Sequence, residues 1–549
     1  MVEHSLQSVA FPVLDEAQIA ELGRCTAAAP KLYRGGQTLF AVGERNFKFF
    51  IIKSGEIEIF DYSGDQPRVI VVHRKGEFTG DVSHLTGLPS VVSAVAKGDC
   101  EVYEISTEAL RRALNQCPGL SDIILQAFIA RRQLLRESPD FTGLRVIGSR
   151  YSQDTFRIRD FLARNRALFT WVDLESDPHV DRLLKEFGIT EADTPVVACG
   201  HMLLLRNPSN QQLADGIGIH QPLEDTMYDL LVVGAGPAGL AAAVYGASEG
   251  LLTAVLESTA PGGQAGASMR IENYLGFPTG LTGSELAGRA ILQANKFGAR
   301  LSVPTPASRL EFQNGYAMVS GTGAETISAK CLLIATGAEY RKLDVKGCER
   351  FEGTGVYYAA TPAEARLCEG SQVLVVGGGN SAGQAAVYLA QHALKLLLLI
   401  RGDDLNKNMS SYLVRRIEQT PNIELLRNTT IQRMDGDGHL GCVEIVDSQT
   451  KQRRTIETPA VFSFIGASPR TDWLPSEVER DAKGFVRTGA ALAQSPHWTV
   501  ARTPFLLETS RPGVFAAGDV RSGSVKRVAS AVGEGAMAVQ FVHEYLKQM

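Results

Sequence analysis

The sequence has no Cys-x-x-Cys pair. All of its cysteines lie more than three residues apart; the eight are Cys25, Cys100, Cys117, Cys199, Cys331, Cys348, Cys368 and Cys442. Closely spaced thiols are the signature of redox dithiols and of most zinc sites, so we expect neither a local dithiol nor a metal centre. Scattered cysteines fit a reducing cytoplasm, and no disulfide framework is expected.

The sequence also lacks long apolar runs and a strong excess of one charge. Apolar runs such as Leu396–Ile400 are far shorter than the ~20 residues that span a bilayer. The first residues lack the basic and apolar regions of a signal peptide. The formal net charge of −5 gives no electrostatic reason for binding nucleic acid or an anionic membrane. We therefore expect a cytoplasmic protein whose partners are neither nucleic acids nor membranes.

What is present is enough chain for several domains. At ~100–200 residues per domain, 549 residues predict about three to five. The hydrophobic fraction of 44% is ordinary for globular domains, so several cores can form. We expect an α/β protein in four parts: a jelly-roll barrel over 1–138, a middle α/β domain over 143–222, a first nucleotide unit over 226–340 and 468–549, and a second nucleotide unit over 341–467.

Short strands broken by glycines fill residues 31–105. Lys48–Lys53 and Glu56–Phe60 flank Ser54-Gly55, which predicts a hairpin. The tight spacing favours a jelly roll, with helical patterns over 14–22 before it and 107–137 after it. The string Gly-Gln-Thr-Leu-Phe-Ala-Val-Gly-Glu at 36–44, followed by these two strands, resembles the cyclic-nucleotide-binding fold.

The phosphate-binding segment departs from that family. The family runs Phe-Gly-Glu-Leu and later Pro-Arg, whereas this chain has Thr79-Gly80-Asp81-Val82 and Pro89-Ser90. Asp81 is a shortened acid, and Ser90 offers no cation for a charge-assisted pair with a cyclic phosphate. Backbone amides at a short helix starting near Ser83 would hold an anion only weakly. We expect that the barrel does not bind cyclic AMP in the usual way, and serves packing, dimerisation or another ligand.

The middle segment alternates strands and helices. Strands are predicted over 144–148, 169–173, 194–197 and 201–205, with helices over 155–165 and 179–187. The pattern resembles a thioredoxin or glutaredoxin fold, and this resemblance implies a cis peptide before Pro195. The loop that would carry the dithiol, Ser149–Asp154, has no cysteine. Because a redox carrier of this kind needs thiols, we expect a docking or structural role.

A buried-strand pattern over 228–233 runs into Gly234-x-Gly236-x-x-Gly239 and a helix. In such a loop the first glycine permits a tight turn, the second lets the backbone approach a pyrophosphate, and the third allows close helix–strand contact. A second strand ends in Glu257, an acid placed to accept ribose hydroxyls. Strand, glycines, helix, strand and acid in this order predict a dinucleotide site that includes Pro237 and Ala238.

Further stretches resemble bacterial thioredoxin reductases, which are flavoproteins with two dinucleotide sites. The resemblance covers roughly 320 residues and implies FAD, held in addition by Gly263, Gln264, Asn273, Ala335, Thr336, Gly337, Gly518, Asp519, Arg527, Val528 and Ala529. It implies that Asp519 hydrogen-bonds the ribityl or pyrophosphate part. A helix beginning near Val528 would face the flavin, where its dipole stabilises negative charge.

A second glycine loop, Gly377-x-Gly379-x-x-Ala382, follows the strand pattern 372–376 and predicts a nicotinamide nucleotide site that includes Asn380, Ser381 and Gly466. The next strand ends at Arg401, where an NADH-preferring site would place an acid. Arg401 can pair with a 2′-phosphate, which favours NADPH over NADH. A solvated strand-end residue is the alternative for Arg401, since Asp403 and Asp404 follow it.

The resembled reductases carry their redox dithiol about a dozen residues before this loop, where the chain has Ala359 and Pro362. No catalytic side chain is therefore expected, and the resemblance implies hydride transfer from NADPH to flavin N5, with hinges near 337–342 and 467–470. The acceptor would be a ferredoxin or flavodoxin, a quinone, oxygen or an external thiol partner. Of Tyr357 and Tyr358, one is expected in the core and the other against the flavin.

Two readings of the function stay open. The first is an FAD-dependent NAD(P)H oxidoreductase without an internal disulfide, a homodimer by resemblance. The second is a redox sensor of low turnover, in which the flavin or nucleotide state reaches a partner through the N-terminal module.

Overall fold

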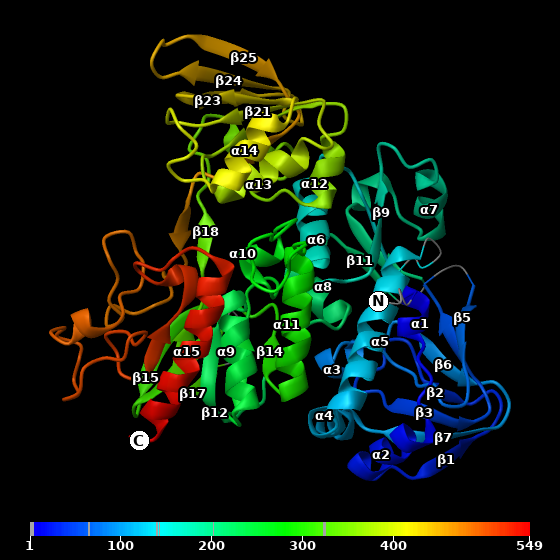
Figure 1. The fold of residues 1–549 in the computed structure, drawn as a ribbon. Coiled ribbons are helices and arrows are strands. Elements are labelled where there is room, and N and C mark those ends of the chain that lie inside the picture. The colour runs from blue at the N-terminus through cyan, green and yellow to red at the C-terminus, as the bar shows by residue number, and fades with distance from the viewer. Residues whose placement is uncertain (1–4, 64–65, 139–140, 142, 201–202, 322–325) are drawn as a thin grey trace.

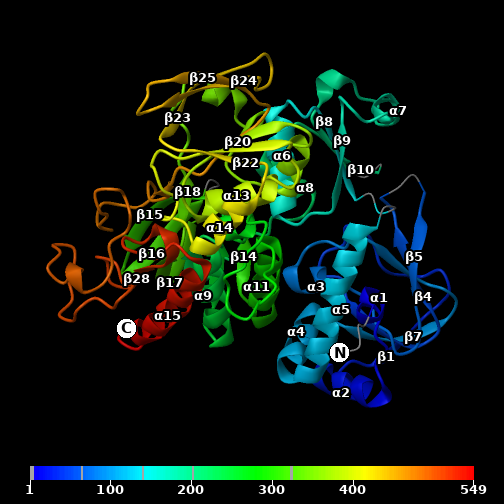
Figure 2. The ribbon, with the colours of Figure 1, turned by 45° about the horizontal axis from the view of Figure 1, so that its top comes forward.

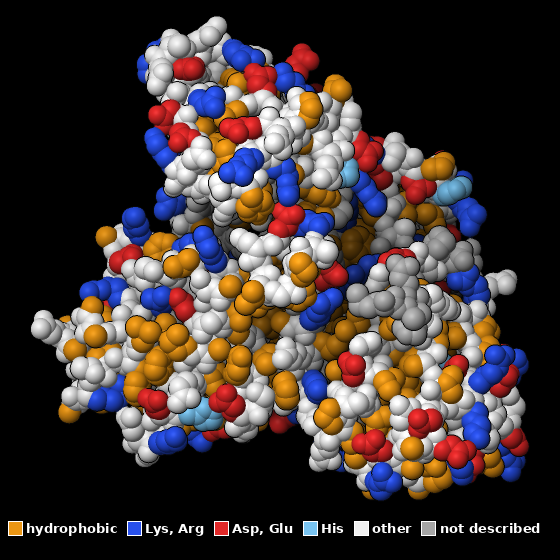
Figure 3. All heavy atoms as spheres, in the orientation of Figure 1, with side chains coloured by type: hydrophobic (Ala, Val, Ile, Leu, Met, Phe, Trp, Pro, Cys, Tyr) orange, Lys and Arg blue, Asp and Glu red, His pale blue; other side chains and the backbone are white. Residues whose placement is uncertain are grey.

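The computed structural model describes residues 5–63, 66–138, 141, 143–200, 203–321 and 326–549. Its sheets gather in four regions along the chain (Figure 1). No helix among the described residues is long and apolar enough to cross a membrane. Lys and Arg side chains are interspersed with Asp and Glu on the face in Figure 3, in line with the weak net charge.

The N-terminal barrel consists of two sheets with helices beside them. Its sheets have the strand orders β1-β7-β3 and β2-β6-β4-β5. The elements are α1 (Leu6–Ala10), α2 (Glu16–Thr26), β1 (Pro30–Tyr33), β2 (Thr38–Phe40), β3 (Phe49–Ser54), β4 (Ile57–Asp61), β5 (Arg68–His73), α3 (Ser83–Thr86), β6 (Ser93–Ala96), β7 (Cys100–Ile105), α4 (Thr107–Gln116) and α5 (Pro118–Glu137).

Two details of the barrel differ from the sequence-based expectation. The prediction of a hairpin around Ser54-Gly55 is wrong. Strand β3 pairs with β7, while β4 pairs with β5 and β6 in the other sheet. The chain changes sheets at Gly55, where a Cβ would lie 2.6 Å from the Asp99 carbonyl oxygen. The long helix pattern over 107–137 is two helices, α4 and α5, because Pro118 begins the second one.

The middle domain has one sheet of order β11-β10-β8-β9, in which β8 and β9 are parallel. The Thr194–Pro195 peptide is cis, as predicted. Only residues 203–205 of the strand predicted over 201–205 lie among the described residues, and they belong to β11. The elements are β8 (Leu144–Gly148), α6 (Gln153–Arg164), β9 (Phe169–Asp173), α7 (Val180–Glu186), β10 (Val196–Cys199), β11 (Leu203–Arg206) and α8 (Asn210–Gly216).

The first nucleotide unit is built on a seven-stranded sheet with its parallel part at β14-β13-β12-β17 and β28 beside β17. Apolar side chains of β12, α9, α11, β17 and α15 form one of its cores. The elements are β12 (Met227–Val233), α9 (Pro237–Ser248), β13 (Thr253–Leu256), α10 (Gly263–Gly266), α11 (Gly283–Phe297), β14 (Arg300–Ser302), β15 (Ala307–Gln313), β16 (Tyr316–Gly321), β17 (Thr326–Ile334), β28 (Val514–Ala516) and α15 (Val528–Leu546).

The second nucleotide unit has a parallel sheet of order β19-β26-β20-β21-β22 and a separate antiparallel sheet, β23-β24-β25. Two paired strands, β18 (Ala338–Tyr340) and β27 (Ala467–Pro469), connect the units at the predicted hinge positions (Figure 2). The remaining elements are β19 (Val356–Tyr357), α12 (Pro362–Leu367), β20 (Gln372–Val376), α13 (Asn380–Leu389), β21 (Lys395–Leu399), α14 (Ser411–Gln419), β22 (Ile423–Leu426), β23 (Thr429–Asp435), β24 (Cys442–Asp447), β25 (Arg453–Glu457) and β26 (Val461–Ser463).

Candidate nucleotide-binding sites

The first glycine loop joins the carboxyl end of β12 to α9, and its three glycines have different surroundings. Gly234 has a φ of +105°, and a Cβ there would lie 2.3 Å from the Ala335 carbonyl oxygen. A Cβ at Gly239 would lie 1.8 Å from the Gly234 carbonyl oxygen. At Gly236 the nearest atom to an added Cβ is the Gly263 Cα, 3.9 Å away. The fold therefore requires glycine at 234 and 239, while the space at 236 is open to a ligand.

Glu257 follows β13 and fastens this loop. Its Oε2 accepts a hydrogen bond from the Ala235 backbone N–H at 2.8 Å, and its Oε1 accepts one from Thr259 N–H at 2.9 Å. Oε1 also accepts from the Ser258 hydroxyl at 3.3 Å and from Ala260 N–H at 3.4 Å, so a further lone pair remains on Oε2 for a predicted hydrogen bond to a ribose. Glu257 therefore also stabilises the loop backbone, a role that the sequence pattern did not indicate.

The C-terminal signature brings a carboxylate and a helix terminus close to the same loop. A Cβ at Gly518 would lie 3.0 Å from the Ala238 Cβ, which places the 518–520 turn against α9. Burial raises the pKa of the half-buried Asp519 carboxyl. Among the described residues no side chain caps the N-terminus of α15 at Arg527 and Val528, so its first amides stay available. These groups suit a polyhydroxyl chain and a developing negative charge.

Other predicted residues lie around this loop. Gln264 in α10 donates through Nε2 to the Ala338 carbonyl at 2.6 Å, and the Thr336 hydroxyl donates to the Arg470 carbonyl at 2.8 Å. Both bonds hold the segment that leads into β18. Asn273 lies exposed in the loop before α11. Its neighbour Glu272 forms an ion pair of 2.9 Å with Arg416 of α14, a contact between the two units that the sequence did not indicate.

In the second glycine loop, too, one glycine is closely surrounded by backbone and another faces open space. Gly377 has a φ of +144°, and a Cβ there would lie 2.5 Å from the Phe464 carbonyl oxygen, whereas a Cβ at Gly379 would meet nothing within 4 Å. The Asn380 side chain accepts from Ser410 N–H at 2.7 Å, and the Ser381 hydroxyl lies 3.1 Å from the Tyr340 hydroxyl. Tyr340 belongs to β18, so this contact joins the loop to the connection between the units.

Arg401 lies exposed just beyond β21. The two acids that follow it are engaged locally: Asp403 pairs with Lys407 at 2.7 Å, and Asp404 accepts from Asn406 N–H at 2.9 Å. These acids are therefore occupied by their own turn, and Arg401 has no ion pair with another described residue. A free guanidinium at this strand end suits an anionic group on a nucleotide.

The segment that leads to Ala359 contacts the middle domain through Tyr357. The ring of Phe156 in α6 lies 5.6 Å from that of Tyr357, and Tyr357 also packs on Phe462 at 5.3 Å. Tyr358 turns to another core and donates its hydroxyl proton to Glu352 at 3.1 Å. Both tyrosines thus have protein partners. That one of them also covers a flavin stays a prediction.

Helix α6 reaches both nucleotide units (Figure 1). Beyond Phe156, Tyr151 stacks on His439 of the second unit with ring centroids 4.7 Å apart. At the other end of the helix, Asn165 donates to the Thr259 carbonyl of the first unit at 2.9 Å. The loop before α6 therefore contacts the second unit at His439, while α6 itself contacts Tyr357.

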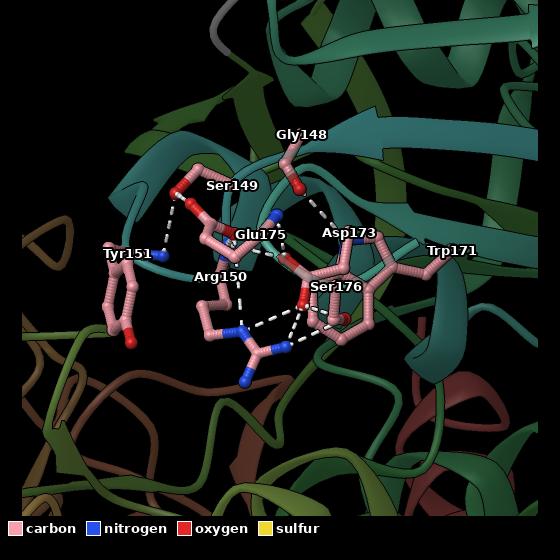
Figure 4. A network of polar contacts seen from close by, with 8 residues as sticks. All are labelled: Gly148, Ser149, Arg150, Tyr151, Trp171, Asp173, Glu175 and Ser176. Atoms are coloured by element: carbon pink, nitrogen blue, oxygen red, sulfur yellow. Dashed lines mark hydrogen bonds and ion pairs between the residues drawn. The ribbon is translucent and has the colours of Figure 1, made fainter. Parts of the chain in front are cut away.

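Polar and charged side chains fill the loop that begins at Ser149 in the middle domain (Figure 4). Arg150 donates through Nε to Asp173 at 2.7 Å and through Nη2 to Ser176 at 2.8 Å. The Ser149 hydroxyl donates to Glu175. Tyr151 points away from this network, towards the second unit. The loop is thus ordered by an ion-pair network.

An open pocket of about 550 Å³ lies between the barrel strands and helices α1 and α5. Its walls are mostly apolar, and the residues that touch it include Phe40, Ile70, Val92, Leu134, Asp81 and Ser90. Asp81 already pairs with Arg132 at 3.2 Å and accepts from Ser83 N–H at 2.9 Å. The shortened acid therefore supports α3 and α5.

Two Rossmann-like units with open glycine loops define an oxidoreductase with two dinucleotide sites. The family model for pyridine nucleotide-disulphide oxidoreductases matches residues 228–535, and the chain belongs to this family. The model for the cyclic nucleotide-binding domain matches residues 30–117.

Similar proteins agree with this assignment. The thioredoxin reductase of Bacillus subtilis is 32% identical over 327 residues, covering 59% of this chain and 97% of that protein. The thioredoxin reductase of Treponema pallidum is 34% identical over 322 residues, covering 59% and 98%. The crystal structure of Lactococcus lactis thioredoxin reductase superposes with a TM-score of 0.53 at 27% identity, covering 59% of this chain and all of that one. The chain is a thioredoxin reductase-like flavoprotein oxidoreductase with an additional N-terminal part.

Proposed function

We propose that this protein is an FAD-dependent NAD(P)H oxidoreductase whose electrons leave to an acceptor other than an internal disulfide. The observation that carries the proposal is the pair of open glycine loops, at Gly236 and Gly379, in a chain with Ala359 and Pro362 at the dithiol positions. FAD, when bound, would take a hydride from the nicotinamide nucleotide and release electrons to the acceptor.

The chain's own residues would position the two nucleotides. Backbone amides beside Gly236 and at the start of α9 suit the FAD pyrophosphate, and Glu257 the ribose. Asp519 and the first amides of α15 suit the remainder of the cofactor. The Gly379 loop with Asn380 and Ser381 suits the second nucleotide. Hydride transfer requires no side-chain acid or base, so the protein contributes position and electrostatics.

Turnover with a panel of acceptors tests this proposal. Purified, FAD-loaded protein is mixed with NADPH and, in turn, a ferredoxin, a flavodoxin, a quinone, oxygen and an external disulfide. We expect rapid NADPH oxidation with at least one non-thiol acceptor, at a rate that alkylation with N-ethylmaleimide leaves unchanged. Turnover with the external disulfide alone, lost on alkylation, would contradict the proposal.

A redox sensor is the second candidate, and contacts of the N-terminal part favour it. Asn115 of α4 donates to the Lys296 carbonyl of α11 at 3.2 Å, and Leu292 of α11 belongs to the barrel's own core. The barrel is therefore packed on the first nucleotide unit. Tight NADPH binding with negligible turnover across all acceptors would favour the sensor.

We expect Arg401→Ala to weaken the use of NADPH. Loss of one charge-assisted contact of ~1.5–3 kcal/mol would raise the KM for NADPH about tenfold or more and leave the KM for NADH nearly unchanged. The measurement is steady-state kinetics with both nucleotides and one acceptor. Arg454→Ala, an exposed arginine on β25, is the matched control. Equal changes in the KM for NADPH and in the KM for NADH would show that Arg401 is a solvated residue at the strand end and does not contact a 2′-phosphate.

The middle domain is proposed as a thioredoxin-like domain without a dithiol, with a docking role. Its strand order, the cis Thr194–Pro195 peptide and the ion pairs of Arg150 support this proposal. The contacts of Phe156 and Tyr151 with the second unit indicate the surface on which it docks.

The barrel is proposed not to bind cyclic AMP in the usual way. Asp81 is engaged by Arg132, and Ser90 donates its hydroxyl proton to the Val92 carbonyl at 2.7 Å. Neither residue offers the cation that a cyclic phosphate requires. Calorimetric titration with cyclic AMP tests this point, and submicromolar binding would contradict it.

A further inference from the structure

The structure brings together two cysteines that the sequence keeps far apart. The Cys25 and Cys117 sulfur atoms lie 2.7 Å from each other, although 92 positions separate the residues. A disulfide bond is ~2.0 Å long, so the two sulfurs need to approach by only ~0.7 Å to bond. The absence of closely spaced cysteines in the sequence therefore did not exclude a thiol pair in the fold.

The two thiols differ in access. Cys25 is near the end of α2 and is partly exposed, whereas Cys117, between α4 and α5, is 4% exposed. Leu22, Leu114 and Leu120 pack around the same junction. Burial, together with the contact to Cys25 and the nearby Glu21, raises the pKa of the Cys117 thiol to about 12. An oxidant from solvent therefore meets the sulfur of Cys25 first.

We propose that Cys25 and Cys117 are a reversible disulfide site, closed by hydrogen peroxide or by exchange with a small-molecule disulfide, whose own S–S bond is reduced to two thiols. With peroxide, the Cys25 thiol becomes a sulfenic acid and one water leaves. The Cys117 sulfur then attacks that of Cys25, a second water leaves, and the S–S bond forms. Two thiols lose two electrons and two protons, and peroxide is reduced to two waters.

The bond would act on the contact between the barrel and the first nucleotide unit. It ties α2 to the α4–α5 junction, two residues from Asn115, which donates to the Lys296 carbonyl. A link across 92 positions also restricts the unfolded chain, so oxidation should raise the thermal stability of the barrel. Oxidation of this pair would thereby restrict the position of α4 at its interface with α11.

Peptide mapping tests the site. The full-length, FAD-loaded protein is treated with peroxide or with oxidised glutathione, denatured, alkylated and cut with trypsin. We expect peptide 25–31 to be linked to peptide 113–131, and dithiothreitol to separate them. Cys442, a partly exposed cysteine on β24, is the internal control and should not join a link.

Two outcomes would overturn the proposal. One is that Cys117 is recovered as a fully alkylated, free thiol while Cys25 is recovered as a sulfenic or higher acid. The other is recovery of both thiols free under conditions that oxidise Cys442. A second measurement guards against an artefact of denaturation: oxidation should raise the unfolding temperature of the unmodified protein and leave that of Cys25→Ser unchanged. Equal shifts in both proteins would also contradict the disulfide.

Discussion

Protein carrying Gly236→Val is expected to fold and to be purified without FAD. The backbone at Gly236 is extended, and an added Cβ would meet only the Gly263 Cα at 3.9 Å, so the fold tolerates a side chain. That side chain would occupy the space through which a pyrophosphate approaches the loop amides. Loss of one or two charge-assisted hydrogen bonds of ~1.5–3 kcal/mol predicts ~10- to 100-fold weaker FAD binding, or more.

The measurement is the flavin absorbance per protein after purification, followed by fluorescence titration of the apoprotein with FAD. Gly379→Val is the matched control, since a Cβ there would meet no described atom within 4 Å; this variant should keep FAD and lose reduction by NADPH. Gly239→Val should fail to fold, because its Cβ would lie 1.8 Å from a carbonyl oxygen. Normal FAD content in Gly236→Val would contradict the assignment of this loop.

The second large effect concerns how many electrons the protein accepts. A flavin takes two electrons, and a disulfide in contact with it takes two more. Residues 355–364, which include Ala359 and Pro362 at the proposed dithiol positions, contain no cysteine that could accept them. We therefore expect two electrons per FAD for full reduction, half of the number expected for a reductase with an internal disulfide.

Local patterns predicted the backbone of the first glycine loop. The tight turn at Gly234, the open space at Gly236 and the close helix contact at Gly239 each depend on a few neighbouring residues. The structure has all three features. The cis peptide at Pro195 was also implied by a local resemblance. These features could be read because their causes lie within one strand–turn–helix unit.

Features that depend on distant partners were missed. The pattern around Ser54-Gly55 has the local signs of a hairpin, but β3 finds its partner in β7, about fifty residues later in the chain. The contact between Cys25 and Cys117 and the ion pair between Glu272 and Arg416 likewise join residues that no local motif connects. Tertiary packing alone decides such pairs.

An anaerobic reductive titration tests the central claim most directly. Air-oxidised Cys25→Ser protein, which lacks the thiol pair of the barrel, is titrated with dithionite and with NADPH while the flavin absorbance is followed. The account predicts that the flavin is fully reduced after two electrons per FAD, before and after alkylation. A requirement for four electrons, falling to two after reduction and alkylation of thiols, would show an internal disulfide relay and contradict it.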